Sequence, residues 1–311
     1  MTWAAWRVQR SMILAAAAVV ALLALWLAFT GLVMGHSQTW KYWTDGDVYV
    51  LFALPSVLGL AFGAPLIASE SNLGTDRLAM TQSVTRARWL AFKLLVGGSV
   101  AVAVAVALTL VLEWWSEAVS ISAFSNSGGL LSGVRIQPTA FDLTGFVLVG
   151  YTLFAFFLGT ALGTVIRKPG WAFAVGLPIF AGARLGVQDW LRPHLVAPAI
   201  FTSLVERASS AVNNGWLLNF ALLPAGRTSP PPGKTWTWWD ENQIYASCTN
   251  RPNPTNASDA HCAVLAHVHY VFQYQPESHY WALQGIETAI FLGLGLLLLG
   301  LTVIKVKRWR I

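Results

Sequence analysis

Long runs of apolar residues alternate along the chain with short polar segments. Six runs reach the roughly 20 residues that an α-helix needs to cross a bilayer: 12–34, 48–68, 90–112, 143–166, 171–190 and 282–304. The run AVAVAVA at 101–107 alternates in side-chain size but not in polarity, which indicates a helix surface rather than a strand. The pattern therefore predicts an all-α integral membrane protein with six transmembrane helices.

Composition supports a membrane protein. Apolar residues make up 55% of the chain and charged residues 11%, against about 25% charged residues in a soluble domain. The first apolar run follows Arg7 and Arg10 as a signal peptide would, but Met12–Met34 is too long for a signal peptide and has no small-x-small cleavage site. We therefore expect an uncleaved first span.

The basic residues predict the topology, because lysine and arginine concentrate on the cytoplasmic side of membrane proteins. One side of the predicted bundle collects most of them: Arg7, Arg10, Arg77, Arg86, Arg88, Lys93, Arg167, Lys168, Lys305, Lys307, Arg308 and Arg310. Both termini and the segment 70–93 are therefore expected in the cytoplasm. Eleven of the 16 tryptophans lie near span ends, as in an interfacial belt, and the tryptophans are not clustered with basic residues. This excludes a stacking surface for nucleic acid.

Three regions follow from this topology. Residues 1–190 hold helices one to five, 191–281 form an extracellular domain between the fifth and sixth helices, and 282–311 hold the sixth helix and a basic cytoplasmic tail. Residues 113–142 are expected to be a partly ordered outer loop, and LVAPAIFTSLVERASSAV at 195–212 a helix along the membrane surface. Cys248 and Cys262 lie on the oxidising side, which favours a disulfide. Closing this loop would stabilise the domain by about 3 kcal/mol in the chain-entropy model.

The longest polar segment between two spans is 70–93, ESNLGTDRLAMTQSVTRARWLAFK. Thr75 is a suitable N-cap, and Asp76 in the first turn complements the helix dipole. Leu78, Ala79 and Gln82 lie three, four and seven residues after Thr75 and so share one helix face, which predicts a short amphipathic helix. The segment is either a solvated loop or a docking element for a cytoplasmic partner.

Sequence signals for catalysis or metal binding are weak. Gly233-Lys234-Thr235 follows three prolines, which remove the N–H groups a phosphate loop needs. His261, His267 and His269 match no standard zinc spacing with Cys262, so surface histidines are favoured over a metal site. We predict no metal site, no cofactor and no enzymatic activity in this chain.

Ionisable residues within the spans carry a sharper signal, since such residues pair with one another or line a cavity. Arg184 and Asp189 lie in the fifth span, beyond Pro178, which should bend or break that helix, and Glu287 lies in the sixth. Two interpretations remain open. The three form either a structural arginine–carboxylate pair or a polar patch on a substrate path.

Two G-x-x-x-G pairs allow close helix approach. They are Gly59/Gly63 in the second span and Gly159/Gly163 in the fourth. Packing within the bundle and self-dimerisation explain them equally well.

Three stretches resemble the permease subunits of type-2 ABC exporters, most closely the compact actinobacterial ones. The first is 54–93, the second runs from Tyr274-Gln275-Pro276 through Trp281 and Gln284 to Glu287, and the third is AWRVQR at 5–10. In the first stretch the residues that carry the resemblance and are expected at the coupling site are Glu70, Gly74, Thr75, Arg77, Leu78, Gln82, Val84, Arg86 and Arg88. Thr81, Ser83, Thr85 and Lys93 also match the pattern of that family.

The resemblance implies that 70–93 is a coupling helix docking on a separate cytoplasmic ATPase, which binds the ATP and magnesium. Leu78 and Val84 would be apolar anchors, and Arg77, Arg86 and Arg88 rim contacts. It further implies a homodimer of permeases in a bacterial plasma membrane that exports a substrate. The Phe-, Trp- and Leu-rich spans favour a hydrophobic or amphipathic substrate. The alternative is a non-transporting membrane sensor whose extracellular domain binds a ligand.

Overall fold

The computed structural model describes residues 14, 18, 21–29, 40–73, 85–123, 135–203, 212, 214–224, 227–229 and 268–308. Within these ranges five helices are long and apolar enough to cross a membrane: Leu51–Ser69, Arg88–Trp114, Val147–Ile166, Pro169–Leu195 and Glu277–Lys307. They correspond to predicted spans two to six. Residues 21–29 of the predicted first span are helical, and most of the remainder of 12–34 lies outside the described residues.

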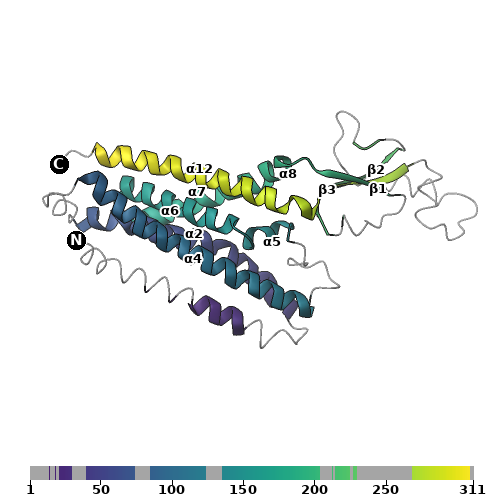
Figure 1. Cartoon of the computed structure of the whole chain (residues 1–311), viewed down its shortest axis with the longest axis horizontal. Coiled ribbons are helices and arrows are strands. Elements are labelled where there is room, and N and C mark those ends of the chain that lie inside the picture. The colour runs from purple at the N-terminus through teal and green to yellow at the C-terminus, as the bar shows by residue number, and fades with distance from the viewer. Residues whose placement is uncertain are drawn as a thin grey trace, which may run out of the picture. The chain divides into compact units, whose positions relative to one another are not determined.

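The helices are α2 (Trp40–Leu73), α4 (Arg86–Ala123), α5 (Pro138–Leu143), α6 (Val147–Ile166), α7 (Pro169–Gly186), a π-helix (Val187–Leu191), α8 (Arg192–Leu195) and α12 (Tyr280–Lys307) (Figure 1). Two boundaries differ from the prediction. The expected outer loop 113–142 is helical up to Ala123 and again in α5, and the fourth span begins at Val147 rather than at 143. Although Pro178 lies inside α7, the helix does not end there.

The chain divides into two compact units. One comprises 1–133, 139–189 and 284–311, and the other comprises 134–138 and 190–283. The second unit contains a three-stranded antiparallel sheet in the order β1-β3-β2, formed by β1 (Ala199–Ser203), β2 (Trp216–Pro224) and β3 (Val268–Gln275). The all-α prediction is therefore wrong for this unit, and the surface helix expected at 195–212 contains strand β1 instead.

Aromatic side chains align across the sheet and explain its register. Phe272 of β3 is paired with Phe201 of β1 and with Phe220 of β2. Both neighbouring rings lie 6.2 Å from the Phe272 ring. Aromatic pairs at such distances stabilise adjacent strands.

In the helical unit, α2 and α6 approach each other at glycines. A Cβ atom added to Gly63 would lie 2.1 Å from the carbonyl oxygen of Phe156, and one added to Gly163 would lie 2.5 Å from that of Ala64. Gly59 and Gly159 are equally crowded, because their added Cβ atoms would lie 2.5 and 2.8 Å from backbone atoms of the facing helix. Both predicted G-x-x-x-G pairs are thus used in packing within one chain.

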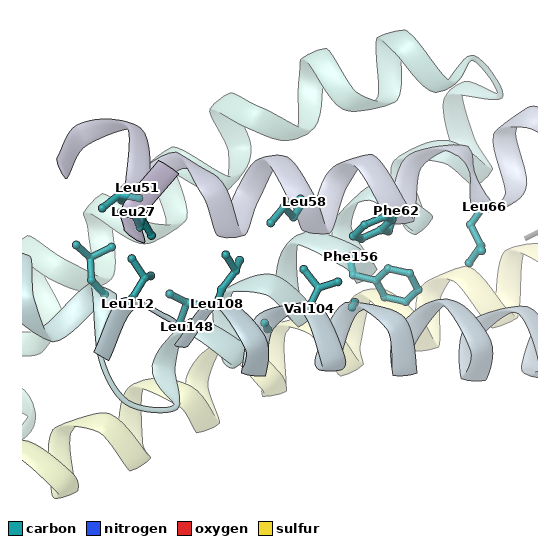
Figure 2. Close-up of a cluster of buried hydrophobic side chains, with 13 residues drawn as sticks. Leu27, Leu51, Leu58, Phe62, Leu66, Val104, Leu108, Leu112, Leu148 and Phe156 are labelled. Atoms are coloured by element: carbon teal, nitrogen blue, oxygen red, sulfur yellow. The ribbon is translucent and has the colours of Figure 1, made fainter. Parts of the chain in front are cut away.

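A buried hydrophobic cluster joins the same helices to α4 (Figure 2). Its members are Leu27, Leu51, Leu58, Phe62, Leu66, Ala101, Val104, Ala105, Leu108, Leu112, Leu143, Leu148 and Phe156. Leu27 comes from the helical stretch 21–29 and lies beside Leu51 of α2 in this cluster (Figure 2). The cluster contains residues of α2, α4 and α6, so the two helices that border residues 74–84 share one core.

Candidate functional site

The predicted coupling segment 70–93 is divided between two helices and the stretch that links them. Residues 70–73, including Glu70, belong to the end of α2, and Arg86 begins α4. Arg88 is exposed, and the backbone N–H of Arg88 lies 3.4 Å from Oγ1 of Thr85, which precedes the helix. The remaining predicted coupling residues, Gly74, Thr75, Arg77, Leu78, Gln82 and Val84, lie outside the described residues.

The two helix ends that border this stretch are joined by Lys93. Its ammonium group donates a hydrogen bond to the carbonyl oxygen of Leu66, at 2.9 Å, and lies 4.5 Å from the centroid of the Trp89 ring. Ile67 of α2, Leu90 of α4 and Val306 of α12 form a small buried cluster, and Trp89 packs against it. Three helices are therefore fastened together at the end of the bundle that bears the predicted coupling segment.

A buried ion pair lies in the interior of the helical unit. Nη2 of Arg184, on α7, donates to Oδ2 of Asp142, on α5, at 2.8 Å, and the side chains are 9% and 1% exposed. Nη1 of Arg184 donates to the carbonyl oxygen of Phe52, on α2, at 2.6 Å. The guanidinium carbon also lies 4.9 and 5.0 Å from the ring centroids of Phe52 and Tyr151. One side chain thus connects α7 with α2, α5 and α6.

Tyr151 extends this polar group to the last span. Its hydroxyl group lies 3.2 Å from Oδ1 of Asp142 and 2.5 Å from Oε1 of Glu287, on α12. Tyr151 and Glu287 are fully buried. The Tyr151 and Phe291 rings pack perpendicular to each other, with centroids 4.8 Å apart. Arg184, Asp142, Tyr151 and Glu287 form a hydrogen-bonded group that we call the polar core.

Beside the polar core, the side chain of Gln284, on α12, forms hydrogen bonds with backbone groups at the break between α5 and α6. Its Nε2 group donates to the carbonyl oxygens of Phe141 and Thr144, both at 3.0 Å, and its Oε1 accepts from the N–H of Val147 at 2.8 Å. Helix ends leave such groups without helical partners, and irregular backbone at membrane depth is tolerated only where protein satisfies it. Gly145 allows the turn through its φ of 71°, and its N–H lies 3.2 Å from Oε1 of Glu113 on α4.

The predicted intramembrane patch is only partly assembled. Arg184 and Glu287 both belong to the polar core, but Asp189 is exposed. The ion-pair partner of Arg184 is Asp142, which the sequence analysis placed in the outer loop. Arginine paired with a buried carboxylate and with a backbone carbonyl is typical of a structural site, and the polar core connects several helices of the bundle. One donor of the group, Nε of Arg184, is buried without a hydrogen-bond partner among the described residues.

Reactive and metal-binding groups give no further site in the described part of the chain. No group of three or more His, Cys, Asp or Glu side chains that could hold a metal ion occurs among the described residues. Cys248, Cys262, His261 and His267 lie outside these residues. His269 is described, and its Nε2 lies 3.0 Å from the carbonyl oxygen of Arg227.

Five helices that are long and apolar enough to cross a membrane define a helical protein that crosses the membrane several times. The chain belongs to the ABC-2 membrane transporter related family, whose model matches residues 31–192, more than half of its length. Searches of curated proteins and of solved structures gave no match. Family membership makes the chain an ABC transporter membrane subunit, a class that generally works with an ATPase partner, and confirms the resemblance to type-2 ABC permeases.

Proposed function

We propose that this chain is the transmembrane subunit of an ATP-driven exporter in a bacterial plasma membrane. A separate ATPase hydrolyses ATP and docks on segment 70–93, two copies of the chain form the path, and both termini are cytoplasmic. The family match carries the proposal, because it covers α2, the coupling segment and α4. The chain itself supplies no phosphate loop, so hydrolysis is assigned to the partner.

The charge distribution supports the same orientation. Arg88, Arg167, Lys168, Lys305 and Lys307 are exposed and lie at the α4, α6–α7 and α12 ends that the topology brings to one side. Lysine and arginine favour the cytoplasmic side, where an ATPase with access to ATP must also lie. A hydrophobic or amphipathic substrate is favoured by the apolar spans and the scarcity of charged side chains among them.

The coupling site is tested by reversing two of its charges. We expect wild-type protein, solubilised gently from its own cell, to recover a phosphate-loop ATPase. The variant Arg77→Glu/Arg86→Glu should recover at least tenfold less ATPase, which corresponds to a loss of about 1.4 kcal/mol of binding free energy or more. The reason is that the two arginines are proposed rim contacts of the docked helix. Recovery is measured by quantitative mass spectrometry of the purified complex.

The matched control reverses two exposed charges on the same side of the bundle, Lys305→Glu/Lys307→Glu. This variant should retain the ATPase, because it leaves segment 70–93 unchanged. Equal loss in both variants would indicate a general charge effect instead of a docking site. If even the wild-type protein recovers no ATPase, the exporter proposal is wrong and the non-transporting sensor takes its place.

A further inference from the structure

We infer that Lys93 is a positioning residue that makes α2 and α4 respond as one body to force on the coupling segment. This inference rests on the proposed function, because it assumes that an ATPase pushes or pulls on that segment. It adds the route by which the movement enters the membrane, which family membership does not specify.

The contact between Lys93 and Leu66 lies at matching positions in α2 and α4. Leu66 lies seven residues before the end of α2 at Leu73, and Lys93 lies seven residues after the start of α4 at Arg86. At 1.5 Å per residue, both points lie about 10 Å into their helices. The hydrogen bond from Nζ of Lys93 to the Leu66 carbonyl oxygen therefore joins α2 and α4 at the same distance from the stretch that links them.

The charge of Lys93 makes its contact with α2 strong and directional. A lysine within an apolar span is costly, and such residues are found where they serve a purpose. Both residues lie inside the membrane-spanning stretches Leu51–Ser69 and Arg88–Trp114. The ammonium group is also placed over the Trp89 ring at 4.5 Å, a cation–π geometry that fixes its direction. Lys93 is half-buried, so the contact is partly shielded from solvent.

Apolar contacts around Lys93 add to this hydrogen bond between α2 and α4. Ile67, Leu90 and Val306 pack together beside it, with Val303 against them. The end of α12 is thereby included. An apolar cluster alone permits two helices to slide, because its contacts are not directional, whereas a charged donor on a backbone carbonyl fixes their register. We therefore assign to Lys93 the role of holding the two helices in register while the segment is loaded.

The test uses Lys93→Met, which keeps most of the stem and removes the charged donor, and Lys93→Arg, which restores a donor. Nitroxide labels are attached through a keto amino acid at Val57 on α2 and Leu95 on α4, both exposed positions. The native cysteines then stay unchanged. Each variant is purified with its ATPase, placed in nanodiscs, and the label distance is measured without nucleotide and after trapping with ATP and vanadate.

We expect the same 57–95 distance in both states for wild type and Lys93→Arg, and a shift with broadening on trapping for Lys93→Met. Lys93→Met should still fold, with the circular-dichroism spectrum of the wild type, and should recover the same amount of ATPase, because Lys93 lies inside the span Arg88–Trp114 and is not one of the proposed anchor or rim residues. These two controls separate the role of Lys93 from folding and docking. An unchanged distance in trapped Lys93→Met overturns the inference, as does a loss of docking in that variant. Absence of any ATPase with the wild type refutes the proposed function instead.

Discussion

Replacing Arg184 by methionine is expected to lower the free energy of unfolding by about 3–5 kcal/mol, because removing one partner of a buried ion pair leaves the other charge uncompensated. Asp142 would lose the cation 2.8 Å away, and the carbonyl oxygen of Phe52 would lose its donor at 2.6 Å. Methionine keeps much of the side-chain volume, so the effect reports on charge more than on packing. Unfolding in mixed micelles, followed by circular dichroism, measures the change.

Asp189→Asn is the matched control for this prediction. Asp189 lies five residues further along the same span but is exposed, so its substitution should change stability by less than about 0.5 kcal/mol. The double variant Arg184→Met/Asp142→Leu should recover part of the lost stability, since an apolar pair can replace a buried ion pair at little cost. Equal melting of Arg184→Met and wild type would show that the pair does not stabilise the bundle.

This pair shows what sequence could and could not predict. The position of Arg184 deep in an apolar run predicted that its charge must be paired. The structure confirms this, because Arg184 is buried and bonded to Asp142. The choice of partner depended on α5, a helix of six residues, which is too short to produce a recognisable periodic pattern. Asp142 lies 42 residues before Arg184, and only the packed bundle brings them together. Asp189, the nearer carboxylate, lies on a different face.

The sequence analysis named Gln284 only as part of the family resemblance, and its structural role could not be predicted for a related reason. A neutral side chain in a span gives a weak signal, and its role depends on the unpaired backbone groups of Phe141, Thr144 and Val147. Those groups exist only because the helix breaks at 144–146, and the sequence analysis ran the fourth span through that position. In the sequence, Gly145 was the available indication that the helix breaks here.

The sheet could have been predicted in part. β3, VHYVFQYQ, is rich in β-branched and aromatic residues, which is typical of a strand. β1, AIFTS, is short, and its pairing partner lies about 70 residues away, so no local pattern distinguishes it from the helix that was expected. Predicted spans two to six, by contrast, correspond to long apolar helices of the structure, because a bilayer imposes a length and an apolar composition on every span.

Gly63→Ala is expected to lower the free energy of unfolding by about 1–3 kcal/mol, or more, because overpacking a tight interface forces the backbone to move. The new Cβ atom would lie 2.1 Å from the Phe156 carbonyl oxygen, a backbone atom that cannot rotate away as a side chain could. The same unfolding assay measures this loss, and size-exclusion chromatography with light scattering gives the oligomeric state of the variant.

Gly182→Ala is the control with the opposite expected sign. Gly182 lies inside α7 with no atom within 4 Å of an added Cβ, so alanine should raise stability by about 0.5–1 kcal/mol through its higher helix propensity. If Gly63→Ala melts earlier with an unchanged oligomeric state, the α2–α6 glycines stabilise the individual chain. If it instead keeps its stability and loses an oligomer, these glycines belong to an interface between chains, and the α2–α6 packing is wrong.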